Sequence, residues 1–256
     1  MKIKKTLSPY YHKLVKFSKI TKNKLFGHKK YKKFVVISRS RTGSTLLMAL
    51  LNKHTNIICE GELFKNLDNK SCAEIWHTLY NSKNKKIKQV GFKLFYYHPF
   101  DEDKSVWDFI KKDTDISIIH LTRKNLLKSY VSQKIGEKTK QWTENVNRPH
   151  NFDVSSKQIV LDFKECLETF ETISTFETNA RQTFNDREII EVTYEDLSTD
   201  YSQVMSRVLK QLNLPNEELV TVLKKQNPEP LKKLILNYEE LKDSFNSTKW
   251  KYLFNE

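Results

Sequence analysis

The chain has 256 residues, 38% of them hydrophobic, which is enough for one α/β domain with its own core. Its net charge of +14 is concentrated at the start: residues 1–33 contain twelve Lys and no Asp or Glu, whereas the other 223 residues carry 33 basic and 31 acidic side chains. A nearly neutral body argues against a protein that binds nucleic acid through its whole surface. No apolar run approaches the roughly 20 residues that span a bilayer, so no transmembrane helix is expected.

The cysteines indicate neither disulfides nor a metal site. Cys59, Cys72 and Cys166 are far apart and odd in number, with no Cys-x-x-Cys pair or Cys/His cluster. We therefore expect reduced thiols, no metal and a cytoplasmic protein.

The basic arm, residues 1–33, precedes the domain expected at residues 34–256. Its mixture of apolar residues and lysines would, at helical spacing, form an amphipathic helix on an anionic membrane surface. Pro9 and the irregular spacing favour a solvated, partly disordered tail instead. Peripheral membrane contact through the arm stays an open alternative.

Residues 34–51 predict a strand, a tight polar loop and a helix that opens near Ser44. The apolar residues 34–37 suit a strand covered on both faces. Gly43 permits a backbone conformation that other residues resist, and Ser44 and Thr45 are expected to cap the helix. Free N–H groups at a helix start attract an anion, so this loop predicts a phosphate-binding site.

Two arginines, Arg39 and Arg41, add positive charge to this loop. A nucleoside triphosphatase loop would have Lys before its final Ser or Thr, but here Ser44 occupies that place, with Thr45 at the magnesium-binding hydroxyl. Without the Lys, the terminal phosphates of a triphosphate would lack their usual cation. Arg41 could supply the positive charge to a different phosphate ligand.

The remaining sequence alternates between strand and helix patterns. Strands are expected at residues 56–59, 89–95, 116–121 and 187–193, and helices at residues 71–80, 103–112, 155–184 and 201–212. This alternation predicts a P-loop-like three-layer α/β fold with a central, mainly parallel sheet flanked by helices. Residues 137–155 are polar and are expected to form either a lid over the site or an exposed connector.

The loop sequence Arg-Thr-Gly-Ser-Thr, from Arg41 to Thr45, resembles the 5′-phosphosulfate loop of sulfotransferases. These enzymes use 3′-phosphoadenosine 5′-phosphosulfate (PAPS) as sulfuryl donor. A second motif has Arg123 at the end of a strand and Ser132 nine residues later. This spacing is similar to that of the bacterial carbohydrate branch, which includes trehalose and nodulation-factor sulfotransferases.

The resemblance extends from Phe34 to the C-terminus and implies a two-point grip on PAPS. Arg123 and Ser132 would hold the 3′-phosphate. The 5′-phosphosulfate would be held by the loop, with Arg41 at the leaving group; the loop residues implied are Arg39, Arg41, Thr42, Gly43, Ser44 and Thr45.

Three further residues are candidates for catalysis. The resemblance matches Lys93 to a Lys that contacts the transferring sulfuryl group. Glu62, after Gly61, is expected to be the general base, or else it orients the substrate while His98 is the base. The base proposed for the trehalose enzyme corresponds to Lys65 here, which is a departure from the family pattern.

These motifs predict an enzyme that moves a sulfuryl group from PAPS to a hydroxyl of a carbohydrate or glycolipid. The alternatives are a kinase-like phosphotransferase and a non-catalytic protein that binds polyanions or membranes through its arm. No specific nucleic-acid partner is expected. The sequence gives neither the acceptor nor the oligomeric state.

Overall fold

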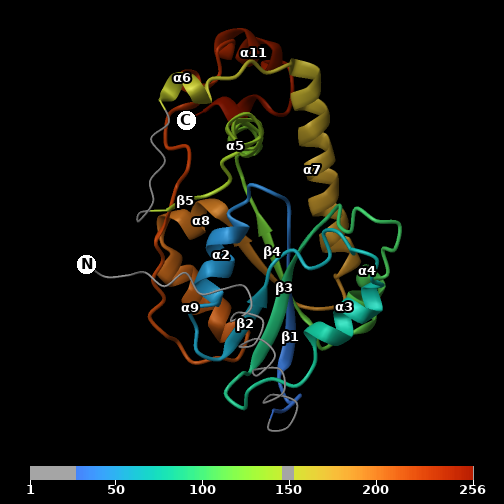
Figure 1. The fold of residues 1–256 in the computed structure, drawn as a ribbon. Coiled ribbons are helices and arrows are strands. Elements are labelled where there is room, and N and C mark those ends of the chain that lie inside the picture. Colours follow the sequence, from blue (N-terminus) through green and yellow to red (C-terminus); the bar gives the residue numbers. More distant parts are fainter. Residues whose placement is uncertain (1–26, 146–152, 256) are drawn as a thin grey trace, which may run out of the picture.

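The computed structural model describes residues 27–145 and 153–255, so most of the basic arm and the middle of the predicted lid lie outside the described residues. The centre of the fold is a parallel sheet of five strands in the order β2-β3-β1-β4-β6 (Figure 1). Its strands are β1 (Lys32–Ser38), β2 (Ile57–Glu60), β3 (Gln89–Phe95), β4 (Ser117–Thr122) and β6 (Ile189–Thr193). The predicted three-layer α/β fold is confirmed.

Helices cover both faces of this sheet (Figure 1). One face packs against α2 (Ser44–Leu51), α8 (Tyr194–Thr199) and α9 (Tyr201–Gln211), and the other against α3 (Cys72–Leu79) and α4 (Val106–Lys112). The central strand β1 separates these two cores, because Phe34 and Val36 face the first and Val35 and Ile37 face the second. All four side chains are fully buried, as expected for a strand covered on both faces.

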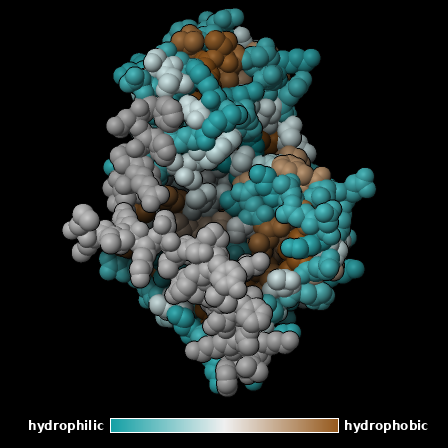
Figure 2. Space-filling model, viewed as in Figure 1, coloured by the Kyte–Doolittle hydropathy of each residue, from teal (hydrophilic) through white to brown (hydrophobic). Residues whose placement is uncertain are grey.

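A third apolar core lies beyond the carboxyl ends of the strands (Figure 1). It is formed by α5 (Leu126–Thr139), α7 (Phe163–Thr183), α10 (Leu231–Leu234), α11 (Tyr238–Phe245) and the 3₁₀ turn η1 (Lys251–Phe254). A short antiparallel pair, β5 (Glu144–Asn145) with β7 (Leu223–Lys224), lies beside this core. Polar residues cover most of the described surface in Figure 2, and apolar patches show near α11 and beside α3 and α4.

The predicted long helix at residues 155–184 is wrong in one respect, because the structure divides it. A short helix, α6 (Val154–Lys157), ends before Gln158, and α7 begins after Asp162. The Asp162 side chain accepts a hydrogen bond from the Glu165 backbone N–H and so caps α7. Between the two helices, Ile159 forms a backbone bridge with Ile235, which a continuous helix would prevent.

Residues 27–33, expected to belong to the arm, are attached to the domain. His28 exchanges backbone hydrogen bonds with Lys83, and the Tyr31 hydroxyl donates to the Asn81 carbonyl at 2.8 Å. Lys32 already belongs to β1.

All three cysteines are buried free thiols. Within residues 27–145 and 153–255, no helix is long and apolar enough to cross a membrane.

Candidate functional site

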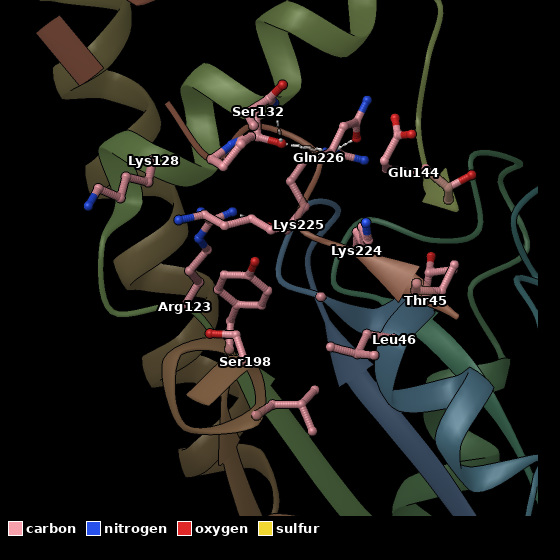
Figure 3. Close-up of a pocket in the computed structure, with 18 of the residues that line it drawn as sticks. Thr45, Leu46, Arg123, Lys128, Ser132, Glu144, Ser198, Lys224, Lys225 and Gln226 are labelled. Atoms are coloured by element: carbon pink, nitrogen blue, oxygen red, sulfur yellow. Dashed lines mark hydrogen bonds between the residues drawn. The ribbon is translucent and has the colours of Figure 1, made fainter. Parts of the chain in front are cut away.

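A hollow of about 690 Å³ opens where the carboxyl ends of the strands meet α2, α5 and the β5–β7 pair; we call it the first hollow (Figure 3). Its wall is formed by the loop between β1 and α2, by parts of α5 and α8, and by the segment at residues 221–230. Its charged lining consists of Arg41, Arg123, Lys128, Lys224 and Lys225 against Glu144 and Glu229. Cations therefore outnumber carboxylates, which suits a ligand with several negative charges.

The loop between β1 and α2 has two residues in the left-handed backbone region. Arg41 has φ 65° and Gly43 has φ 84°. The Thr42 hydroxyl donates to the Arg39 carbonyl at 2.8 Å and closes the turn from inside. α2 then begins at Ser44, as predicted, and its first N–H groups have no acceptor within the helix. Ser44 and Thr45 both line the first hollow.

The expected capping by Ser44 and Thr45 is wrong. Gly43 occupies the N-cap position, and no side chain caps α2. Because Ser44 and Thr45 are already the first helical residues, their hydroxyls cannot cap it. The helix start is thus left open toward the first hollow, which favours an anionic ligand there.

Replacing Gly43 by Ala is expected to lower the free energy of unfolding by about 1–3 kcal/mol. A β-carbon at this position would lie 2.5 Å from Cδ2 of Tyr194, in addition to the strain of a positive φ. Gly61→Ala is the matched control, because a β-carbon there meets no atom within 4 Å, and this variant should not be destabilised. Urea unfolding of both variants checks the prediction, which equal stabilities would contradict.

The two predicted anion-binding motifs form one cluster. The Arg41 guanidinium donates to the Ser132 hydroxyl from Nε at 3.0 Å and from Nη2 at 2.8 Å, and also to the Gln226 side chain. Arg123 donates to the Arg41 carbonyl at 3.0 Å. The Arg41 side chain therefore lies beside Arg123 and Ser132, the two residues predicted to hold the 3′-phosphate. The sequence had instead predicted Arg41 at the leaving group, in the part of the site that holds the 5′-phosphosulfate.

Both guanidinium groups of this cluster are largely buried, yet among the described residues neither forms an ion pair with a carboxylate. Burial, together with the charge of Arg123, lowers the pKa of Arg41 to about 10, and burial also lowers the pKa of Arg123. Arg41 stays positively charged at neutral pH. Nε of Arg123 is buried without a hydrogen-bond partner among the described residues. Two adjacent, largely buried cations without a carboxylate partner favour the binding of an anion.

Several residues of this hollow were not predicted from the sequence. Tyr194 lies under Arg123, with the guanidinium 4.4 Å from the ring centre. The Trp142 carbonyl accepts a hydrogen bond from Arg41 at 2.7 Å. Lys224 and Gln226 reach the hollow from β7 and the segment that follows it (Figure 3). The lysine pair at residues 224–225, before Gln, Asn and Pro, was the available sequence signal for this segment.

A second group of predicted residues meets near the ends of β2 and β3. The Lys93 ammonium lies 2.9 Å from a Glu62 carboxylate oxygen, and Nε2 of His98 lies 3.9 Å from the other oxygen. Lys93 is only 6% exposed, although it is charged and lies in the middle of β3. Both candidate bases therefore lie in one cluster with the candidate catalytic lysine. We call Glu62, Lys93 and His98 the acid–base cluster.

His98 is neutral at neutral pH. Burial lowers its pKa to about 4, more than the nearby Glu62 carboxylate raises it. Neither ring nitrogen has a hydrogen-bond partner among the described residues. The imidazole can therefore accept a proton, but the same burial makes it a weaker base than an exposed histidine.

The structure places Arg39 away from the first hollow. Its guanidinium donates to the Ser129 hydroxyl at 3.4 Å and to the Gln133 side chain, both on α5. Among the residues predicted to bind the donor, Arg41, Gly43, Ser44, Thr45, Arg123 and Ser132 line this hollow, whereas Arg39 and Thr42 are not part of its lining. No group of three or more His, Cys, Asp or Glu side chains that could hold a metal occurs among the described residues.

No protein-family model matches this chain. Nodulation protein H of Rhizobium tropici is 27% identical to it, and the alignment covers 83% of this chain and 88% of that protein. Nodulation protein H of Rhizobium meliloti strain 1021 is 25% identical over 83% of this chain and 90% of its own. A sulfotransferase structure from Alicyclobacillus acidocaldarius aligns with a TM-score of 0.48 at 11% identity, covering 83% of this chain and 90% of that one. The predicted resemblance to the nodulation-factor branch of the sulfotransferases is confirmed by these sequence relatives.

Proposed function

We propose that this protein is a sulfotransferase that moves a sulfuryl group from PAPS to a hydroxyl of a carbohydrate or glycolipid. The observation that carries the proposal is the pair of buried arginines, Arg41 and Arg123, which share a hollow with an uncapped helix start and have no carboxylate partner among the described residues. A ligand with phosphate groups at two points satisfies both features.

In this proposal the first hollow holds the nucleotide part of the donor. Arg41, Arg123 and Ser132 bind the 3′-phosphate. The backbone N–H groups at the start of α2 bind the 5′-phosphate, where negative charge develops as the sulfur–oxygen bond to the leaving group breaks. Lys224 and Gln226 complete the lining of the hollow.

The acid–base cluster acts on the acceptor. As the acceptor oxygen attacks sulfur, its proton passes to the Glu62 carboxylate or to the neutral His98 ring. Lys93, held by Glu62 at 2.9 Å, neutralises charge on the transferring group. Neither step requires a metal ion.

The direct test is calorimetric titration of the full chain with 3′-phosphoadenosine 5′-phosphate (PAP), the product that remains after sulfuryl transfer. We expect saturable binding, and a higher midpoint of thermal unfolding at saturating PAP. Stabilisation by ATP with magnesium, and none by PAP, would refute the proposal in favour of a kinase.

The non-catalytic alternative is tested by deleting residues 1–26, because this leaves the attached residues 27–33 in place. If the protein is an enzyme, the shortened chain keeps its turnover. If it is a binding protein that works through its arm, the shortened chain loses its binding to polyanions or membranes.

A further inference from the structure

Two lysine-rich segments lie side by side at the amino ends of β1 and β3. One leads into β1 and the other leads into β3. His28 of the first segment exchanges backbone hydrogen bonds with Lys83 of the second. Further along, the backbone N–H of Lys32 donates to the Lys88 carbonyl at 2.9 Å. Figure 1 shows the start of β1 at one end of the sheet and α5 beyond the other, so these segments lie opposite the first hollow.

Together the two segments present exposed lysines without carboxylates. Neither residues 27–33 nor residues 81–88 contain Asp, Glu or Arg. Six of their lysines are exposed, and we call them the lysine surface: Lys29, Lys30, Lys32, Lys85, Lys86 and Lys88. Within residues 27–145 and 153–255, none of these six ammonium groups forms an ion pair, whereas the neighbouring Lys33 pairs with Asp113. The positive charge of the lysine surface is therefore not neutralised by the domain itself.

The charge of the domain is distributed unevenly. Residues 34–256 carry 33 basic and 31 acidic side chains, and without the four lysines of residues 83–88 only 29 basic ones would remain. Carboxylates at the same end of the sheet precede β4 and β6, on the other side of β1. Two of them are paired, Asp113 with Lys33 and Asp186 with Arg187. The electrostatic field of the domain thus orients the lysine surface toward an anionic partner.

The sequence of the basic arm continues this composition. Residues 1–26 end where the first described segment begins, and they contain eight Lys but no Asp, Glu or Arg. Arginine binds single phosphates with a planar fork of donors, whereas lysine acts as a point charge that suits a diffuse anionic surface. Aliphatic residues alternate with these lysines, which is typical of segments that lie at the interface of a lipid bilayer; they include Ile3, Leu7, Leu14, Val15 and Ile20.

We propose that the lysine surface, together with the arm that leads into it, binds a bilayer of anionic lipids. A cluster of about four to eight lysines is sufficient for such attraction. The seven residues of β1 span roughly 23 Å between the lysine surface and the end of the sheet where the first hollow opens. This distance exceeds twice the Debye length of about 8 Å at physiological salt. The bound protein would therefore keep the first hollow away from the bilayer, and the lysines should not affect nucleotide binding there.

The test compares two variants of the full chain that each lose four positive charges. The surface variant combines Lys29→Gln, Lys30→Gln, Lys85→Gln and Lys86→Gln. The matched control combines four exposed lysines of the third core, beyond the other end of the sheet: Lys232→Gln, Lys233→Gln, Lys242→Gln and Lys251→Gln. Co-sedimentation measures binding to vesicles of phosphatidylcholine and phosphatidylglycerol in a two-to-one ratio, and to vesicles of phosphatidylcholine alone. Fluorescence anisotropy measures binding of an oligouridylate RNA.

We expect the wild type and the control to bind the anionic vesicles but not the neutral ones, with affinity at least about 10-fold lower for the surface variant. The affinity for PAP should be equal in all three proteins, which also shows that both variants are folded. Equal vesicle binding by the surface variant and the control, equal binding to neutral vesicles, or no vesicle binding would overturn the inference. Binding of the RNA in place of the vesicles would overturn it in favour of a nucleic-acid partner. Failure of the wild type to bind PAP, with vesicle binding as expected, would refute only the proposed sulfotransferase function.

Discussion

Replacing Arg123 by Ala is expected to weaken PAP binding by roughly 30- to 1000-fold, or about 2–4 kcal/mol. Arg123 is 9% exposed, and its guanidinium lies between the Tyr194 ring and the Arg41 carbonyl. These contacts fix the orientation of the guanidinium before the ligand binds. Its removal would take away a buried charge-assisted hydrogen-bond donor that water cannot replace. Calorimetric titration with PAP measures the loss.

Two variants complete the Arg123 experiment. Arg123→Lys keeps the charge but loses the planar fork of donors, so affinity should recover only in part. Lys249→Ala removes an exposed cation that pairs with Glu171 and does not line the first hollow, so this variant should bind PAP as the wild type does. Normal PAP affinity in Arg123→Ala would show that the nucleotide binds elsewhere.

Lys93→Met is expected to lower kcat by about 100- to 1000-fold with little change in PAP affinity. Met keeps the length and packing of the side chain inside β3, so the change removes mainly the charge 2.9 Å from Glu62. Because Lys93 does not line the first hollow, the nucleotide should bind as before. The measurement is the rate of sulfuryl transfer from radiolabelled PAPS to an acceptor that a screen of glycans with the wild type identifies.

Lys65→Met is the matched control for Lys93→Met. Lys65 is exposed and lies three residues after Glu62, so loss of its charge tests whether any nearby lysine would have the same effect. We expect its kcat to stay within about 3-fold of the wild type. Equal kcat values for Lys93→Met and the wild type would exclude Lys93 from the chemistry, even if PAP bound normally.

The sequence predicted the sheet well because the signal for each strand is local. Residues 89–95 were predicted as a strand and form β3 with the same bounds, and β1 extends the predicted residues 34–37 by only a few positions. A short run in which apolar residues predominate identifies a strand buried on both faces, whatever the rest of the chain does. The motif resemblance likewise rested on short stretches that follow such strands.

The orientation of the loop arginines could not be predicted in the same way. Arg41 adopts the left-handed backbone conformation, which is uncommon for a residue other than Gly. With this turn in the loop, Arg39 lies against Ser129 of α5, while Arg41 lies at Ser132. The split between α6 and α7 was missed for a related reason. The pairing of Ile159 with Ile235 joins segments far apart in the sequence, and helical periodicity gives no sign of it.

The lining of the first hollow has a consequence for the order in which the protein becomes functional during synthesis. Its residues run from Arg41, near the start of the domain, to Leu234 in α10. A ribosome releases Arg41 long before Gln226, the residue whose side chain accepts a hydrogen bond from the Arg41 guanidinium. A partly made chain thus has the loop between β1 and α2 but not the segment at residues 221–230 that completes the lining of the first hollow. Under the proposed function, recognition of the donor therefore waits until the chain is synthesised at least through α10.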